Sequence, residues 1–267
     1  MVILRSDDNS AAVTVNDRFP DKTLLLRVKV GENNKIIWRY ENDSELFTVY
    51  CIARHIKEKG SNLGLIMKYI PNARQDRVKE LTDVFTLKYF SEIINSCGFD
   101  YVHVLDPHSP VSEALINNIK IDNGSRYIQS VLRVIDDDVV IYYPDNGAYK
   151  KYTSFVTQAA CYGIKKRDWT TGKILGLDIA LNGIDIKGKT ILMVDDIISY
   201  GGSMYYGAKA LKEMGCGDIY IYASHVENSI LEGELIKSSL FKKIYTTDSL
   251  LTKQHEKIKV LQNNTSY

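Results

Sequence analysis

The chain has 267 residues, of which 45% are hydrophobic and 25% are charged, and its formal net charge is +1 at pH 7. These values are ordinary for a globular protein, and they argue against a disordered chain and against a strongly basic surface that attracts nucleic acid or membranes. The length allows one large domain or two small ones with a substantial core.

Cysteine usage and the N-terminal segment indicate the compartment. The cysteines are widely separated, with no Cys-x-x-Cys pair, at Cys51, Cys97, Cys161 and Cys216. They are interpreted as thiols in a reducing compartment, not as a zinc site or a disulfide framework. The N-terminal segment turns polar too early for a signal peptide, and no apolar run reaches transmembrane length. We expect a cytoplasmic protein with neither a membrane nor a nucleic acid as partner.

In chain order, the apolar pattern first predicts a strand at 36–39, a helix at 44–59, a strand at 63–67, a helix at 82–97 and a strand at 101–105. The pattern then repeats, with strands at 139–143, 189–194 and 219–224 and helices at 148–161 and 203–214. Strands that alternate with helices predict an α/β protein with mostly parallel sheets. The acidic run at 136–138 is a plausible boundary, which gives domains 1–137 and 138–267.

Two loops that follow predicted strands carry ligand-binding chemistry. In the segment 71–77, "PNARQDR", Arg74 and Arg77 can neutralise phosphates, and Gln75 can form a hydrogen bond with a base or a phosphate oxygen. In the segment 191–204, "ILMVDDIISYGGSM", a buried strand ends in two acids, and two glycines precede a helix. Backbone N–H groups at such a helix start favour a phosphate. The acids would repel that phosphate, so we expect them to accept hydrogen bonds from hydroxyls or to lie near a metal. Together the two features describe a ribose phosphate.

These segments resemble a known family. "VDDIISYGGS" resembles the ribose 5-phosphate loop of type I phosphoribosyltransferases and of ribose-phosphate diphosphokinases, also called PRPP synthetases. "ARQD" resembles the ATP-binding signature of the PRPP synthetases, "VLDPHS" their Asp-x-His at a strand end, "YPDNGAYKK" their pyrophosphate loop, and "GIKKRDWTTGK" their mobile catalytic loop. The resemblance implies two tandem phosphoribosyltransferase-like domains, the first with the ATP loops and the second with the ribose-phosphate and diphosphate loops.

The resemblance also implies a reaction and its residues. Pyrophosphate would pass from ATP to the 1-hydroxyl of ribose 5-phosphate, with Mg²⁺ as cofactor and AMP as product. The implied ATP contacts are Phe19, Asp21, Arg74, Gln75, Asp76, Arg77 and His108. The implied ribose-phosphate contacts are Asp195, Asp196, Ser199, Tyr200, Gly201, Gly202 and Ser203. The implied diphosphate loop is Asp145, Asn146 and Gly147. The implied Mg²⁺ ligands are His108 and Asp145. The implied catalytic cations are Lys165 and Arg167, with Lys166 in place of Lys165 if the register shifts by one residue.

The sequence departs from the family at three places. The adenine loop "RFPDKT" lacks the usual acid after Phe19 and Asp21, and Ala148 replaces the second glycine of the diphosphate loop. Tyr200 occupies a position that is usually threonine beside the sugar 5-phosphate. Its ring either turns outward or marks an acceptor extended beyond that phosphate, such as ADP-ribose, whose adenine could stack on tyrosine.

Three further expectations follow from the resemblance. Family members are commonly dimers or hexamers, so a homo-oligomer is expected. A phosphoribosyltransferase that uses PRPP is one alternative, although "PNARQDR" speaks against it. The other is a non-catalytic regulatory relative, which the altered segment 19–23 and Tyr200 faintly favour.

Overall fold

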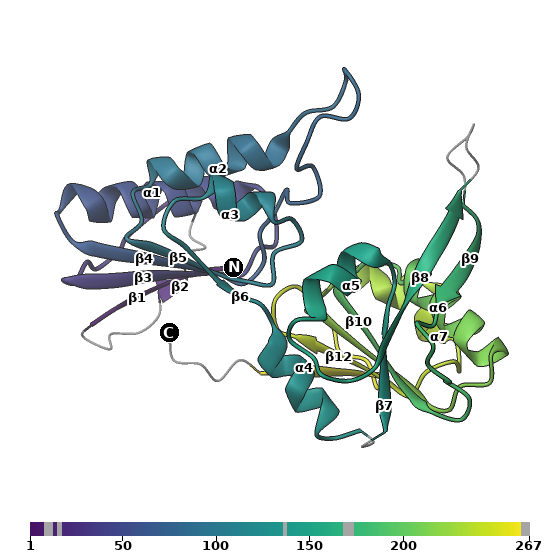
Figure 1. Ribbon diagram of the computed structural model, residues 1–267. Helices are drawn as coiled ribbons and strands as arrows, with labels where there is room; N and C mark the ends of the chain where they lie inside the picture. The colour runs from purple at the N-terminus through teal and green to yellow at the C-terminus, as the bar shows by residue number, and fades with distance from the viewer. Residues whose placement is uncertain (8–12, 15–17, 136–137, 168–173, 263–267) are drawn as a thin grey trace. The chain divides into compact units, whose positions relative to one another are not determined.

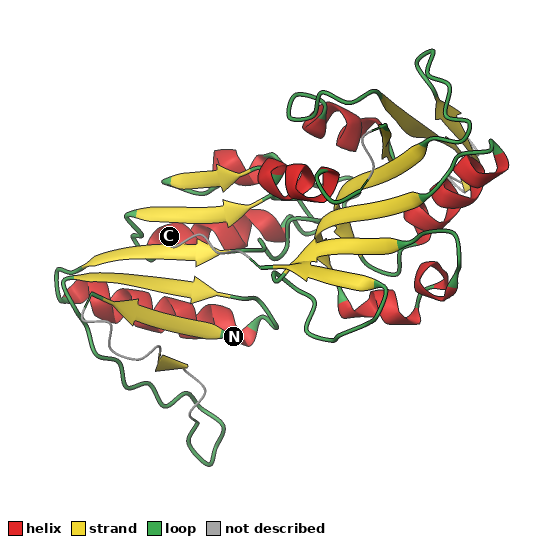
Figure 2. Cartoon of the chain, turned by 90° about the horizontal axis from the view of Figure 1, so that it is seen from below, coloured by secondary structure: helices red, strands yellow, loops and turns green. Residues whose placement is uncertain are grey.

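A computed structural model describes residues 1–7, 13–14, 18–135, 138–167 and 174–262. The chain divides into two compact units, Met1–Asn123 (unit 1) and Gly124–Tyr267 (unit 2). The sequence placed the boundary at 137/138, whereas here the helix that precedes the acidic run lies with unit 2. Both units are α/β, with sheets that are mostly parallel and packed against helices (Figures 1 and 2).

Unit 1 is built on a six-stranded sheet in the order β2-β1-β3-β4-β5-β6. Strands β3 to β6 pair in parallel, and β1 pairs antiparallel with β2 and β3. Both views show α1 and α2 on the same face of this sheet (Figures 1 and 2). The elements are β1 (Val2–Ser6), β2 (Val13–Thr14), β3 (Asn33–Trp38), α1 (Ser44–Glu58), β4 (Asn62–Met67), α2 (Thr86–Ser96), β5 (Tyr101–Leu105), α3 (Val111–Leu115) and β6 (Ile119–Asp122).

Unit 2 is built on a seven-stranded sheet in the order β13-β12-β11-β10-β7-β8-β9. Every pairing is parallel except that between β8 and β9. The elements are α4 (Ser125–Leu132), β7 (Val139–Tyr143), α5 (Asn146–Tyr152), β8 (Ala160–Arg167), β9 (Ile174–Ala180), β10 (Thr190–Ile198), α6 (Gly202–Glu213), β11 (Ile219–Val226), the 3₁₀ helix η1 (Asn228–Glu232), α7 (Glu234–Lys237), β12 (Lys243–Thr247) and β13 (Ile258–Leu261).

The central strands of both sheets form where the sequence is continuously apolar. All five residues of β7 are buried, as are the first five of β10. Such runs suit strands covered on both faces. The buried core of unit 1 includes Trp38 and Leu65, and that of unit 2 includes Met193 and Ile221.

One packing contact in unit 2 depends on glycine. Tyr142 on β7 is fully buried, and its hydroxyl fills the space in front of two glycines. A Cβ atom would lie 2.6 Å from Tyr142 Oη if placed on Gly163 of β8, and 2.8 Å if placed on Gly207 of α6. Real Cβ atoms do not approach other atoms so closely, so the ring fits only while both positions lack a side chain.

The predicted helix at 148–161 is wrong in its second half. Helix α5 ends at Tyr152, and Ala160 and Cys161 open strand β8, where they pair with Ile141 and Tyr142 of β7. Pairing with β7 places Ala160 and Cys161 in the sheet, because their sequence is also compatible with a strand and strand formation depends strongly on tertiary context. None of the helices in the described ranges is both long and apolar enough to cross a membrane.

Candidate functional site

The sheet of unit 2 has its topological switch point between β7 and β10. The chain leaves β7 to form β8 on one side, and β10 later lies on the other side of β7. In open parallel sheets, ligands bind beyond the carboxyl ends of the two strands at this point. The loop after β7 carries Asp145 and the end of β10 carries Asp195 and Asp196, so the topology brings two sequence-predicted loops to one edge.

The acids lie within β10 and not in the loop after it. The strand was expected to end at 194, but it continues to Ile198, and Asp195 is in register with Ala223 of β11. The Asp196 amide donates a hydrogen bond of 2.9 Å to Asp195 Oδ1. Because both carboxylates are on a strand, their backbone is held by the sheet.

The acidic pair is electrostatically strained. Burial raises the pKa of Asp195 well above its ordinary value, and the charges of Asp196 and Asp145 raise this pKa further. The side chain of Asp196 is buried, and its Oδ2 lies 3.3 Å from Lys151 Nζ. Two carboxylates that repel one another are suited to binding a ligand that carries hydrogen-bond donors or positive charge.

The loop from Ser199 to Ser203 turns β10 into α6 through a left-handed glycine. Gly201 has a φ of 81°, and a Cβ atom placed on it would lie 2.7 Å from Leu235 Cδ2 of α7. Gly202 is the first residue of α6, and nothing lies within 4 Å of the Cβ position there. The backbone of the loop is thus fixed by packing on α7, while its second glycine faces open space that a phosphate can use.

Tyr200 points outward from this fixed loop. Its side chain is 59% exposed, while its carbonyl packs against Gly233, where an added Cβ would lie 1.9 Å from the oxygen. Tyr206 on α6 is 64% exposed, and its ring centroid lies 5.4 Å from that of Tyr205. The start of α6 therefore carries two exposed tyrosines, Tyr200 and Tyr206.

Replacing Gly201 by alanine is expected to lower the free energy of unfolding by about 1–2 kcal/mol, because a left-handed conformation disfavours any Cβ and this one also meets Leu235. The melting temperature should fall by roughly 2–6 °C. Gly202→Ala is the matched control, since its Cβ meets nothing and alanine favours a helix. A thermal melt of both variants measures the difference, and equal melting temperatures would contradict the account of Gly201.

Asp145 occupies the start of α5. Its Oδ1 accepts hydrogen bonds from the amides of Gly147, at 3.0 Å, and Ala148, at 3.1 Å. Asp145 is thus an N-cap residue of its own helix. The residues predicted as a diphosphate loop, Asn146 and Gly147, are exposed at this helix start.

The structure places the two expected catalytic cations on a strand. Gly163 to Arg167 continue β8, where Lys165 is in register with Leu177 and Arg167 with Ile174 of β9. The first part of the expected loop, up to Arg167, is therefore part of a strand. The side chains of Lys165, Lys166 and Arg167 lie outside the described part of the structure, as do residues 168–173. Figure 1 shows the ends of β8 and β9 extending beyond the rest of the sheet of unit 2.

In unit 1, the "ARQD" loop and the "DPHS" loop meet through Asp76. Arg77 donates hydrogen bonds of 2.6 and 2.8 Å to the two carboxylate oxygens of Asp76, and Ser109 Oγ donates one of 2.7 Å. The bond from Arg77 lowers the pKa of Asp76 to about 2, and the charge of His108 acts in the same direction. Gln75 accepts a hydrogen bond of 3.1 Å from Thr86, and Arg74 is exposed.

The predicted adenine loop forms a small hairpin turn. Arg18 bridges to Leu24, and Asp21 Oδ1 accepts hydrogen bonds from the amide and the hydroxyl of Thr23, at 3.0 and 2.7 Å. Phe19 is half exposed at this turn. An exposed ring next to a polar turn is suited to stacking on a base.

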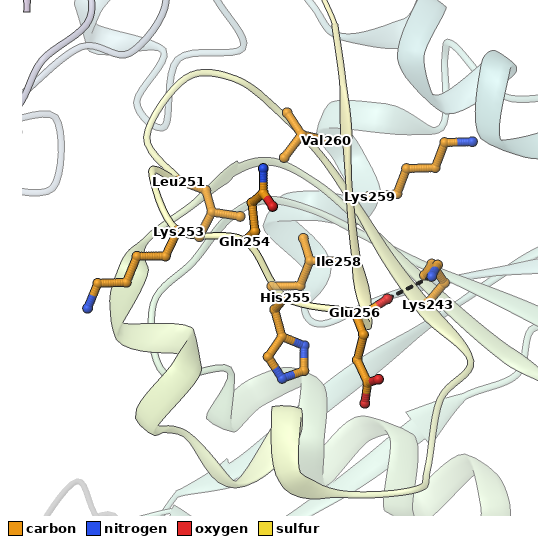
Figure 3. Close-up of a pocket in the computed structure, with 9 residues that line it drawn as sticks. All are labelled: Lys243, Leu251, Lys253, Gln254, His255, Glu256, Ile258, Lys259 and Val260. Carbon is orange, nitrogen blue, oxygen red and sulfur yellow. Dashed lines mark hydrogen bonds between the residues drawn. The ribbon is translucent and has the colours of Figure 1, made fainter.

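A hollow of about 570 Å³ in unit 2 involves none of the residues predicted from the sequence. It is lined by Lys243 of β12, by Leu251, and by the segments 253–256 and 258–260. Lys243 Nζ donates a hydrogen bond of 2.8 Å to the carbonyl of Glu256, and the side chains of Lys253 and Lys259 point away from one another (Figure 3). The cations do not converge, so this hollow carries no assignment.

Two residues near the predicted sites were missed from the sequence. Ser109 contacts Asp76, and Lys151 contacts Asp196. Both residues lie in segments that the motifs cover, but the residue type alone does not indicate which carboxylate a serine or lysine side chain contacts. Within the described ranges, no three His, Cys, Asp or Glu side chains converge as a metal-binding group.

No protein-family model matches the chain. It is 28% identical over 221 residues to a ribose-phosphate pyrophosphokinase of Saccharolobus solfataricus, which covers 79% of this chain and 75% of that protein. It is 26% identical over 217 residues to a ribose-phosphate pyrophosphokinase of Thermococcus kodakarensis, which covers 78% of this chain and 75% of the relative.

Among solved structures, phosphoribosylpyrophosphate synthetase from Mycobacterium smegmatis matches with a TM-score of 0.68 and 20% identity, covering 81% of this chain and 73% of the other. This likeness confirms the predicted fold class. The chain is therefore similar in sequence to ribose-phosphate pyrophosphokinases, and it has the phosphoribosyltransferase-like fold of phosphoribosylpyrophosphate synthetase.

Proposed function

We propose that the protein is an Mg²⁺-dependent diphosphokinase that transfers pyrophosphate from ATP to the 1-hydroxyl of a ribose phosphate. The hydroxyl oxygen forms a bond to the β-phosphorus of ATP, the bond from that phosphorus to the α–β bridging oxygen breaks, and AMP leaves. The acidic pair beside a glycine loop at the switch point of unit 2 is the observation that carries this proposal. The pyrophosphokinase relatives support transfer from ATP.

In unit 2, the acceptor is held at its two polar ends. Asp195 and Asp196 accept hydrogen bonds from the ribose hydroxyls, and Ser199, Ser203 and the amides of Gly201 and Gly202 bind the 5-phosphate at the start of α6. Lys165 and Arg167 stabilise charge on the transferring group. In-line positioning then supplies much of the rate.

In unit 1, the loops that follow β4 and β5 bind ATP. Arg74 and Arg77 neutralise phosphate charge, Gln75 supplies a hydrogen bond, and Phe19 stacks on adenine, with Asp21 as a hydrogen-bond acceptor. Asp76 holds Arg77 in a two-point ion pair that orients the guanidinium group.

The residues present are compatible with magnesium. This ion needs only one or two protein ligands when substrate phosphates and waters complete its octahedral shell. In unit 2, Asp145 is the proposed contact, and the charge on Asp195, Asp196 and Asp145 favours a cation there. In unit 1, His108 is separately the proposed contact for magnesium that accompanies ATP. Bound magnesium would neutralise charge on the transferred phosphates.

The exposed ring of Tyr200 favours an acceptor that extends beyond its 5-phosphate, such as ADP-ribose. The loop backbone is fixed on α7 while the ring is exposed, so the phosphate site is open and an adenine could stack there. Aromatic stacking on a base contributes about 1–3 kcal/mol. Ribose 5-phosphate itself is the alternative acceptor, and then Tyr200 contributes nothing.

A side-by-side assay of AMP release with ribose 5-phosphate and ADP-ribose tests both parts of the proposal. We expect AMP with ATP and Mg²⁺, and we expect Tyr200→Thr to lower kcat/KM for ADP-ribose by about tenfold, as for a lost stacking contact. Tyr89→Thr on α2, where Tyr89 is 52% exposed, is the control. A preference for ribose 5-phosphate that Tyr200→Thr leaves unchanged contradicts the extended acceptor.

Absence of AMP with either acceptor contradicts the diphosphokinase. Product formation from PRPP and a base would then favour a phosphoribosyltransferase, and nucleotide binding without turnover would favour a regulatory protein. The family resemblance also supports a homo-oligomer, a dimer or a hexamer, in the cytoplasm.

A further inference from the structure

The acidic pair of unit 2 lies against a lysine that no motif assigns. Lys151 of α5 places its Nζ 3.3 Å from Asp196 Oδ2. The side chain of Asp196 is 9% exposed and that of Lys151 is 28% exposed. Solvent and salt screen such a pair less than a surface pair, and removing one partner leaves the other charge buried.

Stacked aromatic rings define the position of this lysine. Lys151 Nζ lies 5.2 Å from the ring centroid of Tyr152, a cation–π distance. The Tyr152 ring stacks on Tyr143 of β7, with centroids 6.1 Å apart and planes within 6°. Both rings are fully buried. The ammonium group is thus held between a rigid aromatic surface and the carboxylate.

The charges around the pair show why a cation is needed there. Asp195 and Asp196 are adjacent on β10, and Asp145 at the start of α5 adds a third negative charge. Lys151 is the positive charge that acts on Asp195 in the opposite direction to these acids. Lys151 therefore offsets part of this negative charge.

We propose that Lys151 is a positioning residue for the acceptor. It holds Asp196 in place and offsets the negative charge of the acidic pair, so that both carboxylates can accept hydrogen bonds from the hydroxyls of a ribose phosphate. The inference rests on the proposed function of this site. Lys151 acts through Asp196 and does not itself contact the reacting atoms.

Titration calorimetry of the full chain with ribose 5-phosphate and with ADP-ribose tests this role. We expect Lys151→Met to weaken the binding of the acceptor by about tenfold, as for a lost hydrogen bond to a charged group, with ATP affinity unchanged. Lys151→Arg should restore most of the affinity, because it returns the positive charge. Lys150→Met is the matched control, since Lys150 is exposed on the same helix.

A double substitution separates positioning from general stability. If Lys151 acts through Asp196, Lys151→Met should weaken binding little further when Asp196→Asn is already present. Equal losses in both backgrounds overturn the inference, as does wild-type affinity in Lys151→Met or a loss that Lys151→Arg does not restore. A wild type that binds an acceptor but releases no AMP disproves the diphosphokinase and leaves this test valid, whereas a wild type that binds neither acceptor overturns both.

Discussion

Lys165→Ala and Arg167→Ala should each lower kcat for AMP release by about 10²-fold or more, because preorganised cations near a transferring phosphoryl group act mainly in the transition state. ATP affinity should change little. Both residues lie on β8, whose backbone is paired with β9 with a shift of register between Lys166 and Arg167. Steady-state rates with varied ATP and acceptor measure the effect.

Lys166→Ala is the informative comparison for this prediction. It removes the same charge from the same strand, between the two predicted positions. A loss of kcat in Lys166→Ala with no loss in Lys165→Ala would mean that Lys166, and not Lys165, is the catalytic cation. A higher KM with unchanged kcat in Lys165→Ala and Arg167→Ala would mean that these two residues only bind substrate. Thermal melts of all three should agree, because the substitutions lie on a strand already held by the sheet.

Asp195→Asn and Asp196→Asn should each lower the rate of AMP release by at least about tenfold, as expected when a charged hydrogen-bond acceptor is lost. Their stabilities should differ. The pKa of Asp195 is raised by burial and by neighbouring acids, so its ionised form opposes folding as pH rises through that pKa. Asparagine removes this repulsion, and the melting temperature of Asp195→Asn at neutral pH should stay constant or rise.

Asp196→Asn should instead lower the melting temperature, because it removes the buried carboxylate that lies 3.3 Å from Lys151 Nζ. Glu213→Gln on the exposed side of α6 is the control for both variants. Full activity in both aspartate variants would disprove the assignment of the acidic pair. Loss of activity together with a higher melting temperature in Asp195→Asn would be a direct sign that the site retains charge at the expense of stability.

Several central strands could be predicted because each is a short, continuous apolar run, which is typical of a strand buried on both faces of a parallel sheet. The bounds predicted for β5 and β7 match the structure, and β10 was found although it runs four residues further. The prediction missed the strands β1, β2, β6, β8, β9, β12 and β13. Lysine interrupts the apolar pattern of the short strands β6 and β13. Helix α5 was overextended because residues 153–161 carry no proline or glycine to mark its end.

The candidate site could be predicted in part for a related reason. Residue types and spacing indicate which loops bind ligands, since strand ends in a parallel sheet share one edge. They do not indicate partners that come from other elements. The capping of α5 by Asp145, the contact of Asp76 with Ser109 and the contact of Lys151 with Asp196 all depend on side-chain geometry.

The contact of Tyr142 with two glycines has a consequence for sequence evolution. Because the phenol fills the space in front of Gly207, a side chain can appear there only in a chain where residue 142 has become smaller. Gly163 is closed in a second way, because an added Cβ would also lie 2.8 Å from the carbonyl oxygen of Pro144. Positions 142 on β7 and 207 on α6 should therefore covary among relatives, and a side chain at position 207 should appear only after residue 142 has become smaller. Position 163 on β8 should stay glycine even where residue 142 is small, because the backbone closes it.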